Sequence, residues 1–293
     1  MPKSNAFSGR ISYVAFFFAC LIIAWGIIAF FTTHETLTQK SPQNNPFKSN
    51  YLDENVVTKS LPVKTLLLST QKGGDGKVIR YVNGDLNPTI SIRPGQIQRW
   101  KVYNDSNIFF KVSIPGISFY VVARDGNVTT IPVTTSEEVL APKDSIELLI
   151  QGPGWGNYEV VSADLISNNP EEFMVLKSES IPVFGLRIPD ALVPNYDLRN
   201  AKIEKTQELI LEKRNGDLYV DGEKVNDDVI MRTIGKKTVE QWHLQNASDE
   251  FISFTVPRNI FQVVQINGNP IERFGYDHTF VISPKGSVTI RVQ

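Results

Sequence analysis

The chain has few cysteines, histidines and methionines. Its 293 residues include one cysteine, Cys20, three methionines and three histidines, which are His34, His243 and His278. Sites that need several imidazole or thiolate ligands are therefore poorly supplied, which argues against most metalloenzyme classes. A single cysteine also excludes a disulfide bond within the chain.

The chain has no excess of charge of either sign and no sequence motif of a known catalytic site. Its 30 Lys and Arg residues stand against 31 Asp and Glu residues, a net charge of −1. No overall field therefore attracts nucleic acid, and nucleic acid is not expected as a partner. A Gly-x-Ser-x-Gly elbow is absent, and the glycine-rich residues 72–76 lack the features of a phosphate-binding loop.

One long apolar run is present, at residues 11–31. Its roughly 21 uncharged residues, at about 1.5 Å each in a helix, match the ~30 Å hydrocarbon core of a bilayer. Lys3 and Arg10 precede the run and Glu35 follows it, so the positive-inside rule places residues 1–10 in the cytoplasm. We predict a single-pass anchor in the cytoplasmic (inner) membrane, with the C-terminal domains on the periplasmic or extracytoplasmic side.

Two other interpretations of this run fit the residues less well. A cleaved signal peptide would have a shorter apolar region followed by small residues, and Phe30–His34 offers no such cleavage site. Lipidation of Cys20 would need a lipobox, which Phe17–Ala19 does not provide. The polar residues 32–60 are expected to form a flexible tether with an end-to-end distance of roughly 30 Å.

The rest of the chain contains an internal duplication. The segment around Trp100 is similar to the segment around Trp242, which lies 142 positions later. The same offset relates three further pairs of segments: Phe119–Val122 with Phe261–Val264, Asp125–Gly126 with Asn267–Gly268, and Leu140–Pro142 with Ile282–Pro284. A repeat this long indicates a duplicated domain, because solenoids repeat every 20–50 residues or so.

Each copy has the pattern of a β-sandwich. Residues 99–103 and 287–292 alternate between apolar and polar side chains with a period of two. Asn-Gly and Asp-Gly pairs separate such runs, and no long amphipathic helix is evident outside the membrane run. We predict an all-β fold of two tandem sandwiches, at residues 61–166 and 206–293. An irregular, proline-bearing connector at residues 167–205 joins them.

The duplicated region resembles a known family. Residues 83–106, 119–127 and 139–150 look like the second cupredoxin domain of multicopper oxidases. Residues 188–203 resemble the linker that follows in that family, and much of the sequence from residue 219 to the end is similar to the start of its third domain. The resemblance covers roughly residues 62–293 and implies that both sandwiches are cupredoxin-like Greek-key domains.

The copper ligands of that family are not matched in this sequence. The family has a His-x-x-His-x-His segment in its third domain, and its three imidazole positions fall on Ile252, Thr255 and Pro257. Isoleucine and proline side chains have no donor atom, and a lone threonine hydroxyl is a poor copper ligand. The family's first domain and its His-Cys-His segment also have no counterpart in residues 1–293. We therefore expect no metal, no cofactor and no enzymatic activity.

Two histidines remain as candidates for other chemistry. His243 should face away from Trp242, because neighbours on a strand point to opposite faces of the sheet. His278 follows Asp277, but the same geometry separates the two side chains, and no nucleophile is specified nearby. Both are interpreted as ordinary structural histidines.

Large apolar residues at expected loops and edges are more informative about binding. Trp155 stands in a glycine-flanked loop, Phe184 lies in the connector, and Phe109 follows a polar stretch. Exposed aromatic side chains are common anchors of protein interfaces, so these three are the candidate interface residues. Packing of Trp155 over the end of a sandwich, or of Phe109 into the next strand, is the alternative.

These observations favour a non-catalytic, membrane-anchored binding or scaffold protein outside the cytoplasm, with other envelope or membrane proteins as partners. Copper-less proteins of this fold include a bacterial cell-division protein, so the resemblance suggests a cell-envelope or division complex. A second hypothesis is an integral accessory subunit of a secretion or respiratory complex, with Gly26 allowing close helix contact in the membrane. A third is a copper-handling accessory that completes a site with a second chain.

Overall fold

The computed structural model describes residues 60–163, 165, 169–194, 196–225, 234, 238–256, 259–271 and 275–293. The predicted anchor, most of the predicted tether and Pro257 lie outside the described residues. In the described part, no helix is long and apolar enough to cross a membrane. Regular structure in that part is nearly all β-strand, accompanied by a short 3-10 helix, η1 (Leu198–Asn200).

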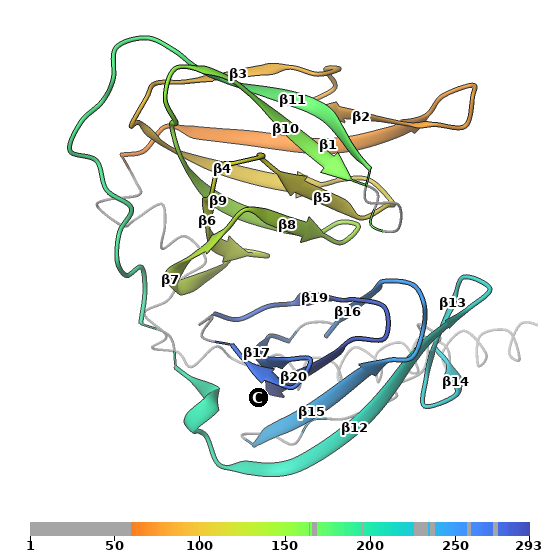
Figure 1. Ribbon diagram of the computed structural model, residues 1–293. Helices are drawn as coiled ribbons and strands as arrows, with labels where there is room; N and C mark the ends of the chain where they lie inside the picture. Colours follow the sequence, from red (N-terminus) through yellow and green to blue (C-terminus); the bar gives the residue numbers. More distant parts are fainter. Residues whose placement is uncertain are drawn as a thin grey trace, which may run out of the picture. The chain divides into compact units, whose positions relative to one another are not determined.

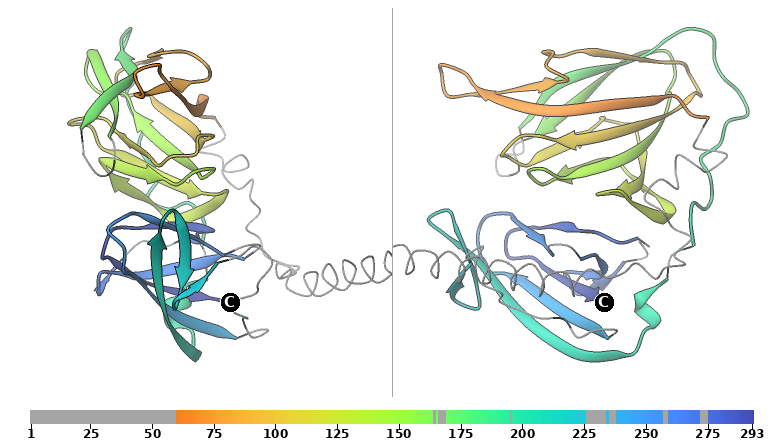
Figure 2. Two further views of the ribbon diagram at one scale, coloured as in Figure 1. Left: turned by 90° about the vertical axis from the view of Figure 1, so that its right-hand side faces the viewer. Right: turned by 180° about the vertical axis from the view of Figure 1, so that it is seen from behind.

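Strands β1 to β11 form a first sandwich of two sheets (Figures 1 and 2). The six-stranded sheet has the order β2 (Val78–Val82), β1 (Val63–Lys72), β4 (Ile97–Asn104), β9 (Ser145–Gln151), β6 (Phe119–Arg124) and β7 (Asn127–Thr135). The facing sheet has the order β3 (Thr89–Ile92), β11 (Pro170–Ser178), β10 (Gly156–Ala163), β5 (Phe110–Ser113) and β8 (Glu137–Leu140).

Strands β12 to β20 form a second sandwich. Its larger sheet has the order β14 (Glu223–Lys224), β13 (Asp217–Val220), β12 (Ile203–Arg214), β15 (Val239–Asn246), β20 (Ser287–Val292), β17 (Phe261–Ile266) and β18 (Asn269–Pro270). The smaller sheet pairs β16 (Ile252–Thr255) with β19 (Thr279–Ile282). The predicted all-β fold of two tandem sandwiches is thus present in the described residues.

The alternating side chains of these strands build one core in each sandwich. Trp100, Phe110 and Phe119 are almost fully buried in the first core. Trp242 and Phe261 occupy the second core, where Trp242 contacts the ring of Phe254 edge-on at 6.5 Å. Alternation places every second side chain of a strand on the same face, so the pattern around Trp100 and Trp242 is consistent with their burial.

The duplication extends to individual hydrogen bonds. The indole Nε1 of Trp100 donates to Gln98 Oε1 at 3.1 Å, and that of Trp242 donates to Glu240 Oε2 at 3.0 Å. In both sandwiches the first long strand pairs in parallel with the strand that carries the tryptophan, β1 with β4 and β12 with β15. Equivalent residues therefore perform equivalent structural roles 142 positions apart.

One strand lies where the sequence predicts irregular connector. Pro170–Ser178 forms β11, which pairs with β10 in an antiparallel arrangement and with β3 in a parallel one. Its buried residues Phe173, Met174 and Leu176 belong to the first core. Pro170 and the pair Glu171–Glu172 at its start favour a solvated loop in the sequence, yet the Glu171 carboxylate accepts a hydrogen bond from Arg80 at 2.7 Å. The irregular part of the connector is therefore shorter than predicted.

Candidate interaction surface

Three loops converge at one end of the first sandwich, where β3 ends and β4 begins. The turn between these strands, residues 93–96, is joined to the β9–β10 loop by two backbone hydrogen bonds. Gly95 N donates to the Gly152 carbonyl at 2.9 Å, and Gly152 N donates to the Gln96 carbonyl at 2.7 Å. The connector joins the same turn, since Val183 N donates to the Pro94 carbonyl at 2.8 Å. We call this region the β3–β4 end.

Two glycines allow this close approach of three backbones. A Cβ on Gly152 would collide with the carbonyl oxygen of Arg93, and one on Gly95 would collide with that of Val183. Gly95 also has a φ of +75°, a conformation that L side chains rarely adopt. Backbone contacts therefore fix the positions of the loops at this end.

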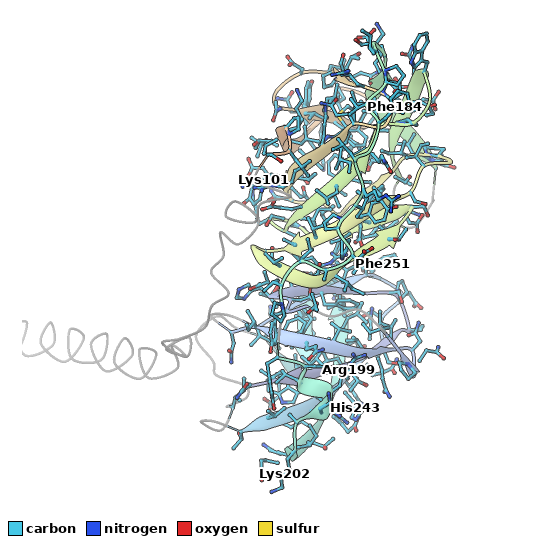
Figure 3. The ribbon with its side chains drawn as sticks, turned by 90° about the vertical axis from the view of Figure 1, so that its left-hand side faces the viewer. Lys101, Phe184, Arg199, Lys202, His243 and Phe251 are labelled. Carbon is cyan, nitrogen blue, oxygen red and sulfur yellow. The ribbon has the colours of Figure 1, made fainter. Side chains whose placement is uncertain are left out.

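The β3–β4 end carries three exposed apolar side chains, which we call the apolar patch. Trp155 is 72% exposed, Ile181 73% and Phe184 87% (Phe184 is labelled in Figure 3). Trp155 lies at this end because its neighbour Gly156 pairs with Ser178, the last residue of β11. Ile181 lies there because its carbonyl accepts a hydrogen bond from Arg93 Nε at 2.8 Å.

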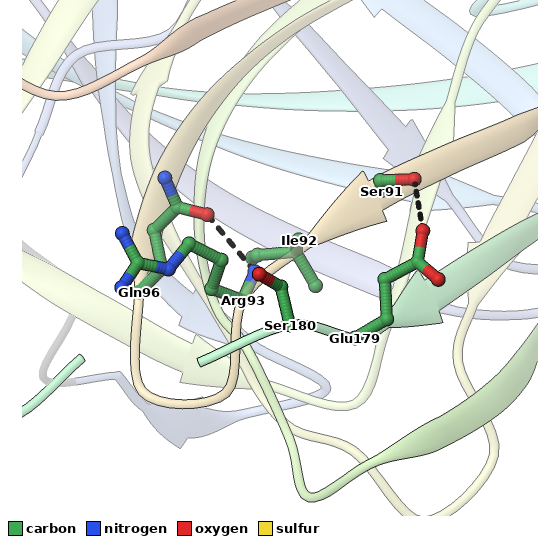
Figure 4. Close-up of a pocket in the computed structure, with 6 residues that line it drawn as sticks. All are labelled: Ser91, Ile92, Arg93, Gln96, Glu179 and Ser180. Carbon is green, nitrogen blue, oxygen red and sulfur yellow. Dashed lines mark hydrogen bonds between the residues drawn. The ribbon is translucent and has the colours of Figure 1, made fainter. Parts of the chain in front are cut away.

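A shallow pocket of about 340 Å³ lies at the same end of the sandwich (Figure 4). It is lined by Ser91, Ile92, Arg93, Gln96, Glu179 and Ser180. Hydrogen bonds from Lys177 and Ser91 hold the pKa of Glu179 below its ordinary value, so this carboxylate is ionised at neutral pH. An ionised carboxylate already held by Lys177 at 2.7 Å is a poor general base, and the pocket suits polar contacts at the edge of an apolar surface.

The candidate interface residues from the sequence lie in different surroundings. Trp155 and Phe184 both belong to the apolar patch, and the exposure of Trp155 means that it does not pack over the end of the sandwich. Phe109 precedes β5, away from the β3–β4 end, and its ring lies 6.2 Å from that of Phe251. The next residue, Phe110, is buried in the first core. The structure therefore brings together two of the three candidates and adds Ile181 to them.

The positions that correspond to copper-binding histidines do not fit copper. Ile252 is 1% exposed and belongs to the second core. Thr255 is exposed, with its hydroxyl 3.2 Å from that of Thr279. No group of three or more His, Cys, Asp or Glu residues that could hold a metal occurs in the part of the chain that the structure describes. No chemical step through copper can be derived from these residues.

The two described histidines make structural contacts. His243, labelled in Figure 3, lies on β15 with Nδ1 2.9 Å from the Thr289 hydroxyl and Nε2 3.1 Å from the Gln241 amide. Trp242 beside it is buried, so the two side chains occupy opposite faces as predicted. His278 Nδ1 lies 2.5 Å from the carbonyl oxygen of Asn259. Neither ring is joined to a serine or cysteine nucleophile by these contacts.

A cluster of buried charges was not evident in the sequence. Asp125 and Asp144 are brought together across β6 and β9, and Ser145 N donates to both carboxylates, at 3.1 and 2.8 Å. Burial raises the pKa of Asp144 to about 8, with a further contribution from the hydrogen bond and the like charge of Asp125. Burial opposes the charge of the adjacent Arg124, but Glu138 and Asp277 outweigh that effect and raise its pKa. Only the sheet pairing reveals this cluster, because its acidic residues are scattered in the sequence.

Comparison with known proteins gives a match in structure alone. No family model matches the sequence, and no curated protein matches it significantly. Among solved structures, a multicopper oxidase from Campylobacter jejuni, described as a metallo-oxidase, matches with a TM-score of 0.66 and 18% identity over 81% of this chain. The chain has the fold of multicopper oxidases.

Two further structures agree. A laccase-like multicopper oxidase from Ochrobactrum sp. matches with a TM-score of 0.66 and 17% identity over 79% of this chain. A multicopper oxidase from the hyperthermophile Aquifex aeolicus matches with a TM-score of 0.64 and 17% identity over 80%. The chain spans about three fifths of these proteins, 59% of the first, 60% of the second and 59% of the third. At these identities the likeness concerns the fold, and function has to be argued from the residues of this chain.

Proposed function

We propose that this chain is a non-catalytic, membrane-anchored binding or scaffold protein whose two cupredoxin-like sandwiches lie outside the cytoplasm, in a cell-envelope or division complex. The observation that carries the proposal is the environment of Ile252. Where the resembled oxidases have a copper-binding imidazole, this chain has an aliphatic side chain packed in its second core. Such a position contributes to the stability of the fold and supplies no ligand.

The apolar patch supports a binding role. Trp155, Ile181 and Phe184 are each more than two thirds exposed, although burial of large apolar side chains stabilises a fold. Their loops are held by backbone contacts with Gly95 and Gly152, so the patch is presented in a defined arrangement. Exposed aromatic side chains on positioned loops are typical of surfaces that bind another molecule.

The apolar run at residues 11–31 and the positive residues before it support the proposed location. As a single-pass anchor, this run would hold the sandwiches on the far side of the cytoplasmic membrane. The proposed partners are therefore other envelope or membrane proteins, together with the membrane itself.

The proposal is tested by in-cell crosslinking followed by affinity purification. Two baits are compared, the full chain and a full chain whose residues 11–31 are replaced by an unrelated transmembrane segment. We expect both baits to recover the same stoichiometric set of envelope proteins, because the exported sandwiches make the contacts. Recovery with the native anchor alone would instead support an integral accessory subunit, and recovery of nothing with either bait would contradict a scaffold.

A copper-handling accessory is tested with two substitutions. His243→Ala and His278→Ala remove the imidazoles of the described residues, and a scaffold should retain wild-type partner recovery with both. Loss of copper tolerance in cells that carry either variant would favour the accessory, provided that the variant is present at the wild-type level.

A further inference from the structure

We propose that the β3–β4 end of the first sandwich docks on the surface of the bilayer that carries the anchor, with Trp155, Ile181 and Phe184 inserted at the headgroup boundary. The inference rests on the proposed membrane anchor and deepens it, because it names the bilayer itself as the partner of the apolar patch. The full chain would then contact its membrane twice, by a spanning segment and by a shallow contact of the folded domain.

The first argument is the chemistry of the patch. Its three side chains are 72%, 73% and 87% exposed, and none of them is charged. Tryptophan is enriched at membrane–water interfaces because its ring is amphipathic, and phenylalanine and isoleucine add apolar area that can enter the acyl boundary. The pocket at the same end is lined by Arg93, Gln96 and Glu179, among others, and these polar side chains suit contact with headgroups and water.

The second argument is the place where the chain joins the first sandwich. Val63, the first residue of β1, pairs with Arg99, near the start of β4, and Arg99 N donates to the Pro62 carbonyl at 2.9 Å. Because β4 begins directly after the turn at residues 93–96, the chain joins the sandwich at the same end as the apolar patch. Residues 1–59, which contain the predicted anchor and most of the predicted tether, are therefore joined to the sandwich at this end.

Because of the predicted tether, a weak contact between the apolar patch and the bilayer is enough to keep the domain at the membrane. The polar segment 32–60 has an expected end-to-end distance of roughly 30 Å, which keeps the patch close to the bilayer. Tethering of this kind gives an effective concentration on the order of millimolar, so three shallow insertions can hold the domain down without high intrinsic affinity. A soluble partner gains no such advantage, and a partner in the membrane must first diffuse to this chain. The bilayer that carries the anchor is always within reach, which favours it as the occupant.

The charges at this end permit the contact. Lys64 and Arg93 are exposed there, while the carboxylate of Glu179 is paired with Lys177 at 2.7 Å. Basic side chains near a membrane are attracted to anionic headgroups. This end of the sandwich thus carries two exposed cations and an acid that is paired with a lysine, although the chain as a whole has no excess of positive charge.

The test uses the full chain in vesicles of phosphatidylethanolamine and phosphatidylglycerol whose acyl chains carry bromine close to the headgroups. Trp25→Phe removes the indole of the proposed anchor. Of the three tryptophans that remain, Trp100 and Trp242 are 1% and 4% exposed, so Trp155 reports on the surface. Interfacial side chains lie about 5–10 Å below the headgroup surface, within reach of the bromines, and we expect the Trp155 emission to fall by about half.

The matched control moves the indole to the opposite end of β3. Leu86 precedes that strand and is 66% exposed. In a chain with Trp25→Phe, Trp155→Phe and Leu86→Trp, we expect emission that bromine does not quench, and the same chain without Leu86→Trp measures the background from the buried indoles.

The outcomes separate the inference from the proposed function. A chain that fails to float with the vesicles would overturn the membrane anchor. A chain that floats, with no quenching of Trp155 or with equal quenching at Leu86→Trp, would overturn docking and leave the anchor intact. A blue shift of Trp155 without quenching, which grows with protein density in the vesicles, would identify a second copy as the occupant and would also overturn the inference.

Discussion

Asn104 and Asn246 show how single side chains hold each sandwich together. Asn104 Nδ2 donates to three carbonyl oxygens, those of Ile108 at 2.8 Å, Ala141 at 2.9 Å and Leu140 at 3.3 Å. Asn246 makes the equivalent bonds with Glu250 at 2.8 Å, Ser283 at 2.9 Å and Ile282 at 3.2 Å. Both asparagines are fully buried, so each Asn-x-Ser triplet is a structural element of its sandwich and is not accessible for glycosylation.

Asn104→Ala and Asn246→Ala should each lower the free energy of unfolding by about 2–4 kcal/mol. Each removes a buried amide that donates to three carbonyl groups and accepts from the backbone N–H of Ser106 or Ser248. Denaturant titration of the full chain in detergent, followed by tryptophan fluorescence, measures the change. Asn269→Ala, at an exposed position, is the control and should change stability by less than about 0.5 kcal/mol. Equal effects at the buried and exposed positions would contradict this account.

Asp144 should make stability depend on pH. Its pKa is raised from 3.8 to about 8 in the folded chain, so the folded state retains a proton that the unfolded chain loses. This contribution is complete below pH 3.8 and is lost as the pH rises to about 8. Asp144→Asn keeps an acceptor for Ser145 N and resembles the protonated acid, so it should remove a dependence of up to ~1.4 kcal/mol per pH unit in this window.

Thermal unfolding of wild type and Asp144→Asn between about pH 4 and about pH 8, the window set by this raised pKa, checks the prediction. We expect the stability of the variant relative to wild type to increase with pH. Asp249→Asn removes a carboxylate that is 89% exposed and should retain the wild-type pH profile. If wild type and Asp144→Asn have parallel profiles, folding does not raise the pKa of Asp144.

Some of the surface and buried residues described above can be predicted from the sequence, and others cannot. Trp155 and Phe184 stand out as apolar residues in loop-like sequence, and both are exposed. The contact between Phe109 and Phe251 could not be predicted, because the two rings lie 142 positions apart and meet only in the folded chain. The pairing of Asp125 with Asp144 likewise depends on the register of β6 and β9, which the sequence does not specify.

At the scale of elements, the loops of the β3–β4 end depend on glycine. A Cβ on Gly152 would collide with backbone, the carbonyl oxygen of Arg93, which cannot rotate away as a side chain can. Gly152→Ala should therefore displace the β9–β10 loop and lower the free energy of unfolding by about 2 kcal/mol. Denaturant titration measures the loss, and proteolysis at the loop reports the displacement.

Gly74→Ala is the matched control for Gly152→Ala. Gly74 lies in the turn between β1 and β2, where a Cβ would have no heavy atom within 4 Å, and its φ is not positive. Its substitution should change stability by no more than about 0.5 kcal/mol. An effect at Gly74 as large as that at Gly152 would mean that loss of chain flexibility, and not the collision with Arg93, is responsible.

Strands are predicted best where both periodicity and turn signals are present. The strands that carry Trp100 and Trp242 follow directly from alternation, and the Asn-Gly and Asp-Gly pairs mark turns in both sandwiches. Strand β11 escapes prediction because its first three residues are proline and two glutamates, which favour a loop locally. Pairing with β10 and β3 and burial of Phe173 and Met174 outweigh that local preference.

At the scale of the whole chain, the two sandwiches are stabilised by the same set of structural features. The parallel pairing of β1 with β4 and of β12 with β15, the buried tryptophans and the buried asparagines are shared by the two sandwiches. None of these features requires a metal. Ile252, which the resemblance aligns with a copper-binding histidine, likewise adds its side chain to the second core. Selection for the fold alone would maintain all of them.

The arrangement across the membrane gives the last prediction. Lys3 and Arg10 are the basic residues before the apolar run, and they should keep residues 1–10 in the cytoplasm. In spheroplasts, protease added from outside should then digest the sandwiches of the wild-type chain.

A chain with Lys3→Gln, Arg10→Gln, Thr32→Lys and Thr33→Lys reverses the charge difference, and a larger fraction of its sandwiches should become protected. A chain with Thr36→Lys and Thr38→Lys added to the native Lys3 and Arg10 keeps positive charge on both sides and should show an intermediate fraction. Protection of the wild-type sandwiches would contradict the proposed orientation, and with it both the envelope partners and the contact of the apolar patch with the outer face of the membrane.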